Sequence, residues 1–140
     1  MDRTAPGKNF LIIAGTLYII FAVFNISWSM IGFATADYWN EVMPMANMSW
    51  RTYYIITPLY SLYTLFMGIA AVKYCNVPEK VGFLLSLLIA GFVIFVAYMI
   101  LIGFAAYSGL GMFWMLPIEF VVPVLYLIGV LKNRAVRDLY

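Results

Sequence analysis

The chain has 140 residues, of which 66% are hydrophobic and 10% are charged, and its formal net charge is +2. A soluble domain of this size carries about 25% charged residues and leaves much of its surface in water, so the composition predicts lipid as the main solvent. The lack of histidine and the single cysteine, Cys75, argue against histidine-held metals and exclude a disulfide within the chain. The small net charge without a basic run argues against nucleic acid as a partner, and no cofactor is indicated.

Four stretches are apolar and long enough to cross a bilayer, which takes about 20 residues. They cover residues 10–32, 53–72, 81–106 and 112–131. The first is too long for a signal-peptide core and lacks a small-residue cleavage site before its polar end, so it is expected to be retained. We predict an all-α integral membrane protein, a single domain over residues 1–140, folded as a bundle of four transmembrane helices.

Lysine and arginine predict the orientation, because short cytoplasmic loops carry an excess of both. The loop of residues 33–52 holds Arg51 alone, and the other basic residues fall on the side of the two termini. These are Arg3, Lys8, Lys73, Lys80, Lys132, Arg134 and Arg137. Both termini are therefore predicted to be cytoplasmic (N-in/C-in), in the plasma (cytoplasmic) membrane, with loop 33–52 facing outward.

Two rows of polar and aromatic residues follow helical spacing, and polar groups in hydrocarbon need partners, so both rows are predicted to face the bundle interior. The rows are Tyr18, Ala22, Asn25 and Ser29 in the first stretch and Tyr53, Thr57, Tyr60 and Thr64 in the second. Together with Tyr98 and Trp114 they predict a polar, aromatic pocket that opens outward. The alternative interpretation is helix packing and an interfacial aromatic belt. A further row, Gly82, Ser86 and Ala90, predicts close helix packing.

Glu119 is the foremost candidate for a functional residue, because an acidic group within the membrane is costly and usually marks an ion, proton or substrate site. Pro117 and Pro123 flank it, and Pro58 lies in the second stretch; each leaves a backbone carbonyl unpaired and predicts a helix kink. The carboxyl is expected to be neutral, to bind a cation or a cationic ligand, or to pair with another subunit. The structural alternative is a protonated carboxyl bonded to a hydroxyl such as that of Tyr60.

Methionines gather on the outward side, and Met43, Met45 and Met48 in loop 33–52 are spaced as in methionine clusters that handle Cu(I). Thioethers are soft ligands that suit this ion. The alternative is a flexible apolar loop.

These patterns leave three hypotheses for function. The first is a transport or ligand-binding protein whose pocket centres on Glu119, is proton- or cation-linked, and takes a small cationic or amphipathic ligand. Transport by such a small chain calls for a homo-oligomer. The second is an accessory subunit of a larger membrane complex, and the third is an outward-facing Cu(I)-handling protein. An enzyme is less expected, because no nucleophile–base pair or paired intramembrane carboxylates are present.

Overall fold

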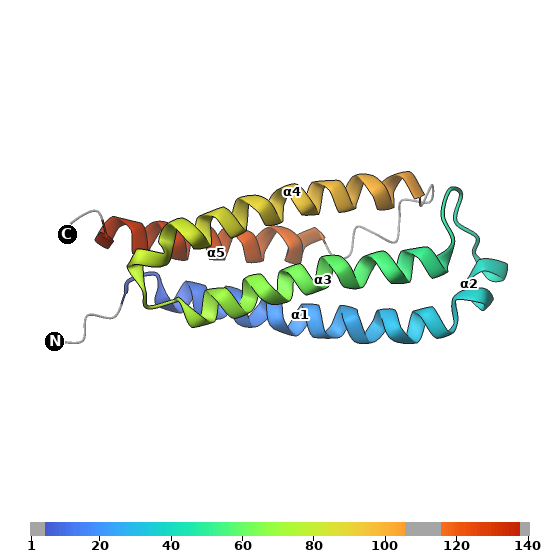
Figure 1. Cartoon of the computed structure of the whole chain (residues 1–140), viewed down its shortest axis with the longest axis horizontal. Coiled ribbons are helices and arrows are strands. Elements are labelled where there is room, and N and C mark those ends of the chain that lie inside the picture. Colours follow the sequence, from blue (N-terminus) through green and yellow to red (C-terminus); the bar gives the residue numbers. More distant parts are fainter. Residues whose placement is uncertain (1–4, 106–115, 138–140) are drawn as a thin grey trace.

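The computed structural model describes residues 5–105 and 116–137, with side chains for residues 5–102 and 120–136. All regular elements within these residues are helices. In chain order they are α1 (Lys8–Ala34), α2 (Ala36–Val42), α3 (Trp50–Lys73), the short helix η1 (Pro78–Lys80), α4 (Val81–Ala105) and α5 (Leu116–Arg137). The long helices α1, α3, α4 and α5 lie side by side, and α1 begins at the end of the bundle where α5 finishes (Figure 1).

Three helices in the described part of the chain are long and apolar enough to cross a membrane. They are Lys8–Ala34, Trp50–Lys73 and Pro78–Ile102. The predicted all-helical class is therefore confirmed, and the chain is compatible with a membrane location. The predicted fourth span, 112–131, starts outside the described residues, and its remainder lies within α5.

The tightest packing joins α1 to α3, which run antiparallel (Figure 1). Most of their buried positions recur every three or four residues, the spacing of one buried face on each helix. The two backbones approach closely at Gly15 and Gly68, where a Cβ atom added to either glycine would lie 2.7 Å from the carbonyl oxygen of the other. Small residues at a seam let two backbones approach in this way.

Both predicted polar rows face the interior. The buried members are Tyr18, Ala22 and Ser29 on α1 and Thr57, Tyr60 and Thr64 on α3. Asn25 and Tyr53 are half-buried.

The predicted close packing of Gly82, Ser86 and Ala90 was wrong for contacts within the chain. All three are exposed, and a Cβ atom added to Gly82 would meet nothing within 4 Å. The α4 helix approaches α3 through Gly91 instead, where an added Cβ would lie 2.6 Å from the sulfur of Met67. Because α4 is apolar on all sides, its composition does not reveal which side packs.

The fully buried side chain of Asn133 ties one end of the bundle together. Its Oδ1 accepts a hydrogen bond from the backbone N–H of Gly7 (2.7 Å), and its Nδ2 donates to the carbonyl of Cys75 (3.0 Å). These bonds join the start of α1, the turn after α3 and the end of α5. We call this the basic end, because it carries the described cations Lys8, Lys73, Lys80, Lys132 and Arg134.

The opposite end is closed by α2 and the segment that leads into α3. The Ser49 hydroxyl caps α3 by accepting from the N–H of Thr52 (3.2 Å), and the indole N–H of Trp50 donates to the carbonyl of Met43 (2.6 Å). The Nη2 group of Arg51 donates to both carboxylate oxygens of Asp37 (3.0 and 2.7 Å). We call this the aromatic end, because five rings pack there in edge-to-face and tilted contacts: Tyr38, Trp39, Trp50, Tyr53 and Tyr54.

A candidate ligand-binding crevice

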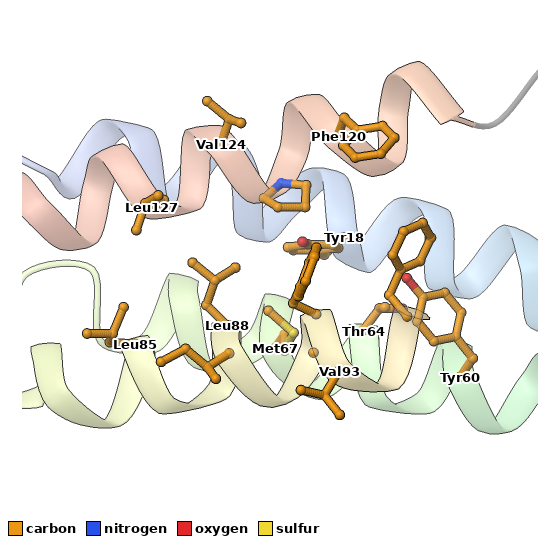
Figure 2. A pocket seen from close by; sticks show the side chains of 15 residues that line it. Tyr18, Tyr60, Thr64, Met67, Leu85, Leu88, Val93, Phe120, Val124 and Leu127 are labelled. Atoms are coloured by element: carbon orange, nitrogen blue, oxygen red, sulfur yellow. The ribbon is translucent and has the colours of Figure 1, made fainter. Parts of the chain in front are cut away.

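A cavity of about 400 Å³ lies between α4 and α5 and reaches down to α1 and α3. Figure 2 shows Val124 and Leu127 of α5 across this cavity from Leu88 of α4. The lining residues are Tyr18, Tyr60, Thr64, Met67, Leu85, Leu88, Ile89, Gly91, Phe92, Val93, Phe95, Phe120, Pro123, Val124 and Leu127. This volume is at the lower end of the range of small-molecule sites, about 300–1,000 Å³.

On one side of the crevice, α4 is fixed against α3 by a hydrogen bond and by a close backbone approach. The Tyr63 hydroxyl donates to the backbone carbonyl of Leu87 (2.7 Å), and Gly91 lets the α4 backbone approach Met67. The rim stays open to the surroundings, since lining residues on both helices are exposed. They are Ile89, Phe92 and Val93 on α4 and Phe120, Val124 and Leu127 on α5.

The lining is almost wholly apolar. Its polar atoms are the hydroxyls of Tyr18, Tyr60 and Thr64, and the Thr64 hydroxyl donates to the carbonyl of Ser61 (2.9 Å). No charged residue lies among the lining residues that the structure describes. A bare ion would find little compensation for its lost hydration here, whereas a hydrocarbon chain would lose only contact with its neighbours in the lipid.

An aromatic ladder leads out of the crevice toward the aromatic end. The rings of Phe120 and Phe95 meet edge to face with their centroids 6.3 Å apart, and Phe95 lies 6.3 Å from Tyr60. Tyr60 stacks on Tyr98 with a centroid distance of 4.8 Å and an interplanar angle of 10°. The crevice therefore changes from aliphatic to aromatic along its length.

Three predicted pocket residues, Thr57, Tyr60 and Tyr98, lie together where this ladder points toward the aromatic end. The hydroxyl oxygens of Thr57 and Tyr98 are 3.2 Å apart and share a hydrogen bond. The Thr57 hydroxyl also donates to the carbonyl of Tyr53 (3.0 Å). Of the three residues, Tyr60 alone lines the cavity.

Two other predicted residues lie apart from the crevice. Asn25 is half-buried on α1 and does not line it. Tyr53 belongs to the aromatic end, with its ring centroid 5.5 Å from Trp50 and 5.2 Å from Tyr54. Their assignment to a ligand site stays a prediction.

The remaining predicted residues of the fourth stretch are only partly covered. Trp114 lies outside the described residues, and so do the side chains of Pro117 and Glu119, although both belong to α5. Along the chain Glu119 directly precedes Phe120, a lining residue. Pro123 lines the crevice and Pro58 sits within α3, and both prolines lie inside uninterrupted helices.

The three loop methionines lie near the aromatic end, away from the crevice. Met43 is exposed, while Met45 and Met48 are half-buried. Among the residues that the structure describes, no group of three or more His, Cys, Asp or Glu side chains can hold a metal ion. Copper binding by the methionines stays a prediction.

The sequence interpretation missed the lower, apolar part of the site, including Met67 and the aliphatic residues of α4 and α5. These residues are apolar, so they do not stand out in an apolar membrane segment. Only the fold shows that they lie on two facing helices.

The chain matches no family model, and neither a curated protein nor a solved structure resembles it significantly.

Proposed function

We propose that this chain is an integral membrane protein that binds the hydrocarbon part of an amphipathic ligand in the crevice between α4 and α5. The proposal includes four spanning helices with both termini in the cytoplasm. It also includes Glu119 as the ionisable group of the site. The observation that carries it is the cavity of about 400 Å³, which is apolar and open sideways between two helices. At membrane depth such an opening gives a lipid-dissolved ligand direct access.

The proposed orientation is supported by the distribution of charge over the fold. Lys8, Lys73, Lys80, Lys132 and Arg134 meet at the basic end, and Arg51 lies at the aromatic end. Because cytoplasmic segments carry the excess of lysine and arginine, the basic end is assigned to the cytoplasm.

The role of Glu119 is supported by its place in the chain. Glu119 comes four residues before Pro123, so helical periodicity puts it close to the crevice-lining face of α5. A carboxyl group at this level suits a ligand with a cationic head.

A photoreactive alkylamine that carries a diazirine on its chain tests the site. With the protein in lipid nanodiscs, we expect crosslinks on the crevice residues of α4 and α5, mapped by mass spectrometry. Val124→Phe should fill the crevice and reduce them. Val121→Phe is the matched control, because both valines are 54% exposed on α5 and only Val124 lines the cavity. Equal labelling of both variants would refute the crevice as the binding site.

Glu119→Gln tests the ionisable group separately. We expect it to remove the preference for the alkylamine over an alkyl alcohol of the same length, while the variant remains folded. An unchanged preference would exclude Glu119 as the group that recognises the ligand. If transport follows from binding, native mass spectrometry should find two or more copies, because a single bundle of this size has little to move against.

The orientation has its own test in single-cysteine variants that lack Cys75. Glu41 and Glu79 are exposed and lie at opposite ends of the bundle. A membrane-impermeant maleimide should label Glu41→Cys on intact cells and Glu79→Cys only after permeabilisation. The reverse pattern would invert the proposed topology.

A second candidate function, an accessory subunit, is favoured by the exposure of α4. Of the apolar stretch in Pro78–Ile102, which contains most of α4, 11% is buried inside the structure. The corresponding share for α3 is 39%. Another membrane protein could cover this surface. In that case the purified chain should aggregate alone and become monodisperse with its partner, whereas a stable, monodisperse chain would argue against this candidate.

A further inference from the structure

Two lysines at the basic end converge on one tyrosine ring. Lys73 ends α3, Tyr74 follows it, and Lys80 ends η1. The ammonium of Lys73 lies 5.4 Å from the centroid of the Tyr74 ring, and that of Lys80 lies 5.9 Å from it. The turn between α3 and α4 thus brings two cations onto a single half-buried ring.

Neither lysine forms a salt bridge with a carboxylate among the described residues. The one ion pair found there joins Arg51 to Asp37 at the aromatic end, and the exposed Glu79 forms no salt bridge with either lysine. Two like charges that share one ring repel each other, and an anion that binds both would relieve this repulsion.

The position of the ring relates this charge to the membrane surface. Tyr74 meets Phe83 edge to face, with centroids 5.9 Å apart and an interplanar angle of 90°. Phe83 is exposed in the first turn of α4, one of the helices long and apolar enough to cross a membrane. The two lysines therefore lie where hydrocarbon gives way to headgroups, above an exposed aromatic surface that a lipid chain can cover.

We propose that Lys73, Tyr74 and Lys80 form a binding site for the headgroup phosphate of an anionic phospholipid. The ammonium groups hold the phosphate, and Phe83 contacts the start of an acyl chain. None of these residues lines the crevice, so the site goes beyond the proposed function and can succeed or fail independently of it.

The experiment titrates the purified protein with phosphatidylglycerol or phosphatidylcholine of identical chains and counts bound lipids by native mass spectrometry. We expect the wild type to prefer phosphatidylglycerol and the double variant Lys73→Gln/Lys80→Gln to lose that preference. The loss should approach about 5-fold for each lysine removed. Tyr74→Phe should keep the preference, and Tyr74→Leu should weaken it, because the ring positions both ammonium groups.

The double variant Lys8→Gln/Lys132→Gln is the matched control. It removes the same charge from the same end, and Lys132 also lies over an aromatic ring, 4.4 Å from the centroid of Phe10. Retained preference in this control supports a local site, whereas an equal loss in both double variants would show diffuse attraction and overturn the proposal. No preference in the wild type would also overturn it. Displacement of the lipid by soluble glycerol phosphate would assign the site to a free phosphate ester instead.

Discussion

Replacing Asn133 by alanine should remove the contact that joins three segments at the basic end. The variant leaves the N–H of Gly7 and the carbonyl of Cys75 without their partner, and both bonds are buried. Each unsatisfied buried group costs about 1–3 kcal/mol. Some water can enter at a bundle end, so we expect the free energy of unfolding to fall by about 2–4 kcal/mol, the lower part of the summed range.

Asn76→Ala is the matched control for this prediction. The Asn76 side chain accepts a hydrogen bond of the same length, 2.7 Å, from the N–H of Ala5, but Asn76 is exposed and water can take its place. Its loss should cost about 1 kcal/mol or less. Reversible unfolding in mixed micelles with increasing dodecyl sulfate measures both variants. If Asn76→Ala proved as costly as Asn133→Ala, burial of the Asn133 bonds would not be the source of the stability.

Gly15→Ala should lower the unfolding free energy in the same assay by about 1–3 kcal/mol, because its Cβ would lie 2.7 Å from the carbonyl oxygen of Gly68. Gly82→Ala, at an open position, should leave stability unchanged or slightly raised, and a comparable loss there would contradict the steric argument. Tyr63→Phe removes the hydrogen bond to the Leu87 carbonyl and should cost about 0.5–1.5 kcal/mol. That variant should also let α4 exchange its amide hydrogens faster than α1 does, and unchanged exchange would show that the bond does not hold α4.

The long helices and the buried polar rows could be predicted from the sequence, because both signals are local. Apolar length locates a span, and a row such as Thr57, Tyr60 and Thr64 identifies its own buried face. Helix α2 could not be predicted, since its seven residues carry no clear apolar period and are held by contacts with α3. The packing side of α4 was wrongly assigned to Gly82 for the related reason that an all-apolar helix has no distinguishable face.

The candidate site also contains a part that local sequence signals predict and a part that depends on contacts between helices. Helical spacing grouped Thr57 with Tyr60, and Tyr98 was predicted to join them from its depth along its own helix. The structure links Tyr98 to Thr57 by a hydrogen bond between α4 and α3. The apolar crevice depends on how far α4 stands from α5, which no single segment encodes. Asn133 is a similar case, because its partners Gly7 and Cys75 are 126 and 58 residues away along the chain.

The close α1–α3 seam also bears on how the protein is made. Everything that this seam needs is present once the chain has been synthesised as far as Lys73. Helices that enter the membrane in order can pair as soon as both have been inserted. The α1–α3 hairpin can therefore assemble before α4 has left the ribosome, and α4 then docks on a finished surface. Asn133 lies in α5 and is made after α1, α3 and α4, so its two bonds form once those helices have been synthesised.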